Sequence, residues 1–106
     1  MQNDFENSRN MTLAFDGDRL SEVCRQYGVA ELSLFGSFAR NEASAASDVD
    51  LIYVLQDGVR MGFALFEFEE DLAAVFGRPV DLLDKASIHH LLRDDVLNDA
   101  RRLYAA

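Results

Sequence analysis

Residues 30–55 read AELSLFGSFARNEASAASDVDLIYVL, and this stretch decides the fold. Residues 30–35 alternate apolar and polar side chains, which predicts a half-buried strand. Gly36-Ser37 follows as a tight turn of small residues, and residues 38–40 are expected to continue it as a helical turn. Residues 48–55 end in a continuous apolar run, which is typical of a central strand buried on both faces. The stretch therefore predicts two strands joined through a tight turn, with acids at the start of the second strand.

The Gly36-Ser37 turn suits the binding of a phosphate group. Gly36 lets the backbone turn where a side chain would obstruct it, so Ser37 can offer its amide and its hydroxyl to an anion. The first amides of the helical turn point at the same place, and Arg40 adds a charged donor. A Gly-Ser pair by itself is also an ordinary turn, so this interpretation depends on the acids that follow.

Two of these acids, Asp48 and Asp50, are one strand pleat apart. Strand side chains alternate between faces, so both lie on the same face of the strand. Two unit charges about 4 Å apart repel each other by roughly 4 kcal/mol at an effective dielectric constant near 20. A divalent cation with oxygen ligands relieves this repulsion, and magnesium is the usual ion beside phosphates. The alternative is that both acids lie at a solvated strand end.

A third acid, Asp81, lies in another short apolar run. The turn Gly77-Arg78-Pro79 precedes residues 80–83, which predict a strand with one embedded carboxylate. A lone buried carboxylate is costly without a partner. If this strand lies next to the strand at 48–55, Asp81 completes a cluster of three carboxylates. The alternative is an acid at a strand edge that faces water, and Asp84 just beyond is expected in a turn.

The remaining segments predict helices around these strands. Asp16 or Asp18 caps a helix that runs to about Tyr27 and stops at Gly28. Together with the strands, this helix and the two described next predict an α/β (α+β) domain in which helices flank a small mixed β-sheet.

Apolar residues recur at three- and four-residue spacing over 59–76 and again over 87–104, which predicts a helix in each range. Phe63 and Phe66 lie off the apolar stripe of the first of these helices. We interpret them as additional core residues; the alternative is an exposed patch for a protein partner.

Length and composition predict one small domain over residues 16–106, preceded by a polar segment over residues 1–15 that is either loosely ordered or bound to a partner. The chain has 106 residues, 49% of them hydrophobic, and a net charge of −9. Only ten Lys and Arg stand against nineteen acids, so direct binding of nucleic acid is not expected. The excess of acids is typical of a solvated face and would also suit a basic protein partner. No signal peptide and no membrane span are expected. The single Cys24 is typical of a reducing cytoplasm.

Three motifs together resemble a known family. GSFAR at 36–40, SDVDL at 47–51 and VDL at 80–82 are similar to the motifs of the minimal nucleotidyltransferase (MNT) family of the DNA polymerase β superfamily. The similarity covers about residues 18–104. It is closest to the small MNT proteins that act as antitoxins to HEPN-domain ribonucleases. One departure is Asn41, where the family often has a second glycine; asparagine tolerates left-handed backbone better than other residues with a side chain.

The resemblance implies a role for each site residue. Gly36 and Ser37 would hold the triphosphate of ATP, and Asp48 and Asp50 would bind two magnesium ions. Asp81 would help to ligate a metal and activate the attacking hydroxyl. The implied reaction is in-line attack of a hydroxyl on the α-phosphorus of ATP, after which pyrophosphate leaves.

The acceptor is also implied by the resemblance. It is a HEPN toxin that binds the antitoxin as a hetero-oligomer and receives AMP on a tyrosine near its ribonuclease motif. Two alternatives stay open. The chain could be an antitoxin that acts by binding alone and retains the acids without catalysis, or it could be a nucleotidyltransferase for a small molecule.

Overall fold

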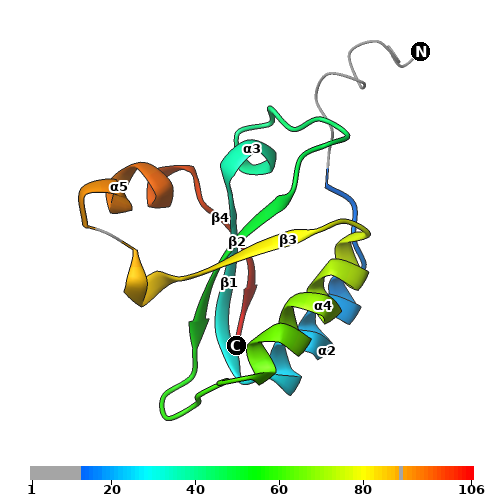
Figure 1. Ribbon diagram of the computed structural model, residues 1–106, viewed down its shortest axis with the longest axis vertical. Helices are drawn as coiled ribbons and strands as arrows, with labels where there is room; N and C mark the ends of the chain where they lie inside the picture. Colours follow the sequence, from blue (N-terminus) through cyan, green and yellow to red (C-terminus); the bar gives the residue numbers. More distant parts are fainter. Residues whose placement is uncertain (1–12, 89) are drawn as a thin grey trace.

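The computed structural model describes residues 13–88 and 90–106, so the expectation for the N-terminal segment falls, over residues 1–12, outside the described residues. The elements in chain order are α2 (Gly17–Gln26), β1 (Val29–Phe35), α3 (Gly36–Ala39), β2 (Val49–Leu55), α4 (Ala64–Phe76), β3 (Val80–Asp84), the short 3-10 helix η1 (Lys85–Ser87), α5 (His90–Asp99) and β4 (Arg101–Ala105) (Figure 1).

The strands form one mixed sheet in the order β3-β2-β1-β4. β1 runs antiparallel to both β2 and β4, whereas β2 and β3 run parallel. The parallel register places Asp50 directly beside Asp81. The prediction of a small mixed sheet flanked by helices is therefore confirmed, and the strand adjacency on which the three-acid cluster was conditional is present.

Helices α2 and α4 lie side by side and cover one face of the sheet (Figure 1). Their apolar stripes meet the inward-facing residues of β1 and β2, and the most completely buried side chains include Leu20, Leu32, Leu51, Phe68 and Leu72. The strand pleat turns Asp50 and Ile52 to the other face, where Leu97 of α5 and Ser33 line a pocket with Ile52. The core thus lies on the helix-covered face, and the acids face away from it.

The first helix has the predicted ends. The Asp16 carboxylate accepts hydrogen bonds from the Asp18 amide at 3.0 Å and from the Arg19 amide at 3.3 Å, so Asp16 is the N-cap. The helix ends at Gln26, two residues before Gly28. Within the described part of the chain, no helix has both the length and the apolar character that crossing a bilayer requires.

The second predicted helix is shorter than expected. It begins at Ala64 instead of residue 59, because Gly62 takes left-handed backbone at φ 54° and breaks the helical path. The interpretation of Phe63 and Phe66 as core residues is wrong. Their side chains are 90% and 65% exposed, because they lie on the solvent side of the helix start, away from Phe68.

The prediction of a helix over residues 87–104 is wrong in its last part. Helix α5 ends at Asp99, and Arg101–Ala105 forms strand β4. The apolar spacing fits a helix, but β1 has an edge not used by β2, and pairing satisfies the backbone groups of both strands. The Ala106 amide extends this pairing with a 2.8 Å bond to the Ala30 carbonyl, so a contact distant in sequence overrides the local periodicity.

Candidate active site

Gly36 is the point at which β1 turns into α3, beside the acids. Its φ is +72°, a backbone conformation that residues with a side chain rarely adopt. A methyl group added there would collide with the Asp50 carboxylate oxygen Oδ2 and lie 3.1 Å from Cγ. Phe35 is the register partner of Asp50, which brings the turn against this carboxylate. Gly36 is therefore required both for the turn and for the space that Asp50 occupies.

The amides of Ser37 and Phe38 stand at the open start of α3. The first helical donor is the Arg40 amide, which binds the Gly36 carbonyl at 3.1 Å, so the preceding amides have no intrahelical acceptor. The turn after α3 closes through the Glu42 amide on the Ser37 carbonyl at 2.8 Å. Asn41 takes φ 61°, which confirms that asparagine accepts the left-handed position.

The three acids influence one another electrostatically. The pKa of Asp50 is raised above its ordinary value, first by burial of the carboxyl, then by the charge of Asp81 and a hydrogen bond with it, and further by the charge of Asp48. Asp50 is half-buried, whereas Asp48 and Asp81 are exposed. Asp48 directly precedes β2 and is not part of it. The structure thus brings the three predicted acids together, although Asp81 is also the exposed acid of an edge strand.

Arg40 lies beside acids as well as near the turn. It is exposed and forms ion pairs with Glu42 at 3.3 Å and with Asp99 of α5 at 3.7 Å. Its charge is also close enough to Asp50 to lower the pKa of that carboxyl slightly against the other effects. A contact of Arg40 with phosphate, predicted from its place after the turn, stays a prediction.

The chemistry of these donors fits a divalent cation. Among the described residues, no three His, Cys, Asp or Glu side chains already form a metal-ligand group. The pKa of Asp50 is nevertheless raised first by burial and then by the negative charges of Asp81 and Asp48, and a bound cation would offset these charges. Magnesium usually keeps several waters and needs only one or two protein carboxylates beside substrate phosphates.

Arg78 is a residue of this region to which the sequence motifs assigned no role. It lies in the turn before β3, and its Nη1 donates to the Ser47 carbonyl at 2.9 Å, one residue before Asp48. An arginine three residues ahead of a strand acid is too common a pattern to predict this contact.

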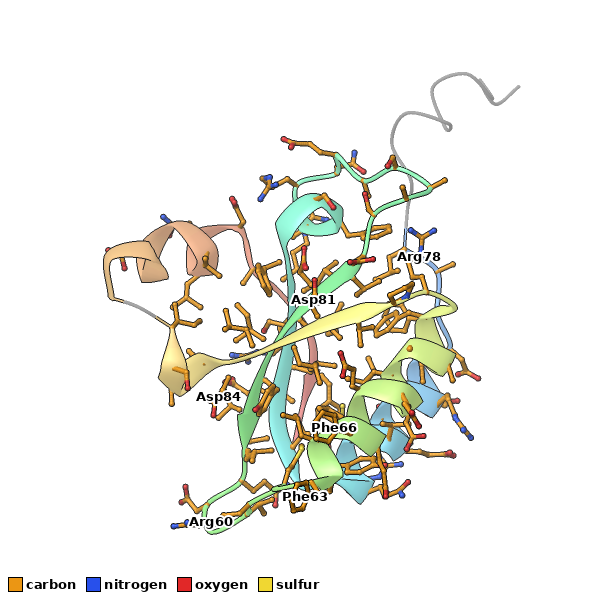
Figure 2. The ribbon with its side chains drawn as sticks, in the orientation of Figure 1. Arg60, Phe63, Phe66, Arg78, Asp81 and Asp84 are labelled. Carbon is orange, nitrogen blue, oxygen red and sulfur yellow. The ribbon has the colours of Figure 1, made fainter. Side chains whose placement is uncertain are left out.

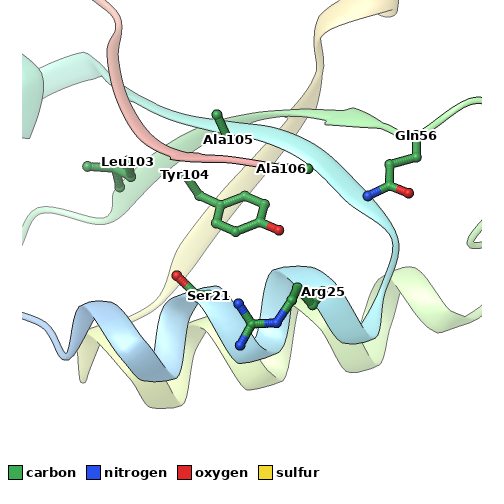
Figure 3. Close-up of a pocket in the computed structure, with 7 residues that line it drawn as sticks. All are labelled: Ser21, Arg25, Gln56, Leu103, Tyr104, Ala105 and Ala106. Carbon is green, nitrogen blue, oxygen red and sulfur yellow. The ribbon is translucent and has the colours of Figure 1, made fainter.

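The cavity in Figure 3 lies elsewhere in the domain. It has a volume of about 570 Å³ and lies between α2 and β4, where Ser21, Arg25, Gln56 and Tyr104 contribute to its lining. None of these residues belongs to the acid cluster. Because Asp48 and Asp81 are exposed, the acid site is an open surface of the domain. The three carboxylates beside the Gly36 turn identify it, and not a large cavity.

Known proteins match this chain in sequence and in fold. Residues 18–103 match the family described as "Nucleotidyltransferase domain". A predicted protein adenylyltransferase of Methanocaldococcus jannaschii is 37% identical over 82 residues, which cover 77% of this chain and 87% of that protein. Protein adenylyltransferase MntA of Thermococcus cleftensis is 35% identical over 78 residues, 74% of this chain and 78% of that protein.

Solved structures show the same fold. A crystal structure of a toxin–antitoxin with AMP-PNP contains a chain that matches with a TM-score of 0.68 at 22% identity, over 86% of this chain and 74% of that chain. A structure of a tri-AMPylated Shewanella oneidensis HEPN toxin in complex with an MNT antitoxin matches with a TM-score of 0.60 at 22% identity, over 85% and 70%.

The family match spans most of the chain, and the fold places the turn and the acids of its three motifs together. The chain therefore belongs to the nucleotidyltransferase-domain family and is one of its minimal nucleotidyltransferases.

Proposed function

We propose that this protein transfers AMP from ATP to a hydroxyl group of a HEPN-domain ribonuclease toxin, with a tyrosine as acceptor, and so acts as an antitoxin. The observation that carries the proposal is the acid pair Asp50 and Asp81, in register on parallel strands, with the Asp50 carboxylate packed against Gly36. The relative named a protein adenylyltransferase and the complex of an MNT antitoxin with an AMPylated toxin support the same reaction.

The residues divide the chemistry between them. The amides at the start of α3 and the Ser37 hydroxyl bind the β- and γ-phosphates, and Asp48 and Asp50 would hold magnesium. Bound magnesium supplies positive charge against the phosphates. Asp81 accepts the proton of the acceptor hydroxyl, whose oxygen forms a bond to the α-phosphorus. The bond from that phosphorus to the bridging oxygen of pyrophosphate breaks, and pyrophosphate leaves.

A protein acceptor fits the exposure and the charge of the site. Asp81 lies on an edge strand and is exposed, so a hydroxyl on the surface of another macromolecule can reach it. The net charge of −9 disfavours nucleic acid and favours a basic protein, such as a ribonuclease that must itself bind RNA. The cytoplasmic location expected from the single Cys24 stays a prediction.

The proposal can be tested with a HEPN-domain protein from the same organism as the candidate partner. Incubation of that protein with this chain, ATP and magnesium should increase its mass by one or more AMP units, and peptide mapping should locate them on tyrosine. The variant Asp48→Ala/Asp50→Ala should abolish the increase. Asp57→Ala is the matched control, because Asp57 is an exposed acid in the loop after β2, outside the cluster. An unchanged partner mass with folded wild-type protein would refute the proposal.

A non-catalytic antitoxin is the second candidate, and the exposed Phe63 and Phe66 favour it. Two exposed phenyl rings on one helix start are suited to bind a protein partner without any chemistry at the acids. Full neutralisation of the toxin by the Asp48→Ala/Asp50→Ala variant would identify this mode of action.

A further inference from the structure

Arg78 contacts the segments that carry the acid cluster. Its Nη1 donates to the Ser47 carbonyl at 2.9 Å and to the Ser44 carbonyl at 3.4 Å, both in the loop that leads into β2. Its guanidinium carbon lies 4.9 Å from the centroid of the Phe38 ring in α3. Arg78 itself lies three residues before Asp81, in the turn that leads into β3 (Figure 2). One side chain thus connects α3, the loop before Asp48 and the strand of Asp81.

These contacts fix the backbone on both sides of Asp48. The Ser47 carbonyl, before Asp48, is bound by Arg78, and the Val49 amide, after it, donates to the Pro79 carbonyl at 2.9 Å. Asp48 itself is exposed and lies outside the strand ladder, so the ladder alone does not fix it. Its position relative to Asp50 and Asp81 therefore depends on the pair Arg78-Pro79.

The rest of the loop has only local hydrogen bonds. The Ser44 amide donates to the Ser47 hydroxyl at 2.9 Å, and the Ser47 amide donates to the Ser44 carbonyl at 3.0 Å. Such bonds give the loop a shape, but they do not attach it to the sheet. The attachment through Arg78 uses two properties that lysine does not combine: several donors in a rigid planar group, and a flat cation that stacks on an aromatic ring.

We propose that Arg78 is a positioning residue that holds Asp48 in place for cation binding and AMP transfer. The inference rests on the proposed function for the identity of the reaction, but not for the contacts. Arg78 acts through the loop backbone, so its loss should displace Asp48 without removing any ligand. Small displacements of a catalytic group are costly, because the groups of a site must be aligned to within a fraction of an ångström.

The test compares Arg78→Gln and Arg78→Lys with the wild-type protein. Arg60→Gln is the matched control, because Arg60 is an exposed arginine at the other end of the molecule (Figure 2). Three quantities are measured: hydrogen exchange of the Val49 amide, the dissociation constant of Mn²⁺ by electron paramagnetic resonance with AMP-PNP present, and kcat and KM for AMP transfer. Thermal denaturation shows whether each variant is folded.

In both Arg78 variants the Val49 amide should exchange faster, and Mn²⁺ binding should weaken about tenfold, as it does when residues that orient metal ligands are lost. The value of kcat should fall by a similar factor while KM for ATP stays within about twofold, since the hydrogen bond from the Arg40 amide to the Gly36 carbonyl holds the backbone of the turn without Arg78. Arg60→Gln should change none of these. If Arg78→Gln does not fold, the same measurements on Arg78→Lys, which keeps the charge and the alkyl chain, test the role of Arg78.

The inference is overturned if the folded Arg78 variants match the wild type in Val49 exchange, or if exchange rises while Mn²⁺ binding and kcat stay unchanged. It is also overturned if Arg78→Lys has wild-type Mn²⁺ binding and wild-type kcat, since a positive charge at this position would then be enough to hold Asp48. Wild-type protein that binds Mn²⁺ but transfers no AMP would refute the proposed function, and the Mn²⁺ affinities of the variants would still decide the role of Arg78. Wild-type protein that binds no Mn²⁺ would refute both.

Discussion

Replacement of Asp50 by asparagine should stabilise the fold while it removes activity. The pKa of Asp50 is raised by burial and by the charges of Asp81 and Asp48, so the ionised carboxylate is unfavourable in the folded protein. Asparagine has nearly the same size and shape, so it fits the space that Gly36 leaves open. The variant Asp50→Asn removes the repulsion without creating a cavity.

The magnitude follows from the strand register. Asp50 and Asp81 are direct partners on neighbouring strands, and such strands lie about 4.8 Å apart. Two unit charges at this distance repel by about 0.9 kcal/mol at the dielectric constant of water and by about 3.5 kcal/mol at an effective value of 20. Asp81 is exposed, so the lower value applies, and we expect the free energy of unfolding to rise by about 1 kcal/mol. For a domain of this size that corresponds to an increase in Tm of about 4 to 8 °C.

The effect should depend on pH in a defined direction. A carboxyl with a raised pKa in the folded state lowers the stability of the fold only above its unfolded pKa, where the unfolded chain can ionise. Below the unfolded pKa of about 3.9 the wild type and the variant should therefore be equally stable. The difference should grow as the pH rises from there through the folded pKa of Asp50, and it should be complete at neutral pH.

Thermal or urea denaturation in EDTA measures the stability of both proteins at about pH 3, below the unfolded pKa, and at about pH 7, and the Asp50→Asn variant should be the more stable one only at the higher pH. Added magnesium should raise the Tm of the wild type more than that of the variant, because a bound cation stabilises the folded state that holds it. An equal or lower Tm of Asp50→Asn at pH 7, with a far-UV spectrum like that of the wild type, would refute the view that Asp50 is electrostatically strained.

Two further substitutions test the packing around the site. Gly36→Ala should destabilise the protein by about 2 to 4 kcal/mol, since it combines left-handed backbone with a collision against Asp50. The control Gly77→Ala, at φ +70° with open space around it, should cost only about 1 kcal/mol. Equal losses of stability in urea denaturation would disprove the collision. Tyr27→Phe should cost about 1 kcal/mol or less in the same assay, because it removes the 2.6 Å bond from the Tyr27 hydroxyl to Asp71 that joins the end of α2 to α4. In the wild type the pKa of Tyr27, raised to about 12 chiefly by this bond, should delay its ultraviolet titration, and a titration near pH 10 would show that the bond is absent in solution.

Local features of the chain were predictable from the sequence because each depends on a few neighbouring residues. The alternation in β1, the apolar run in β2 and the Asp16 cap of α2 follow from strand pleat and helix-end chemistry. The turn at Gly36 was predictable for the same reason, whereas its contact with Asp50 depends on the register of β1 and β2. The start of α4 was missed because the apolar spacing continues past Gly62, whose backbone breaks the helix.

By itself, the sequence determined the strand–turn–strand unit at residues 30–55 and the acids on it, because periodicity and turn chemistry act within a few residues. Only the tertiary structure decided that Asp81 lies beside Asp50, that the last residues pair with β1 instead of extending α5, and that Arg78 attaches the loop before Asp48. Each of these depends on which distant segment supplies a free strand edge or an unpaired carbonyl. A local pattern carries no information about that choice, because the partners meet only after the chain has folded.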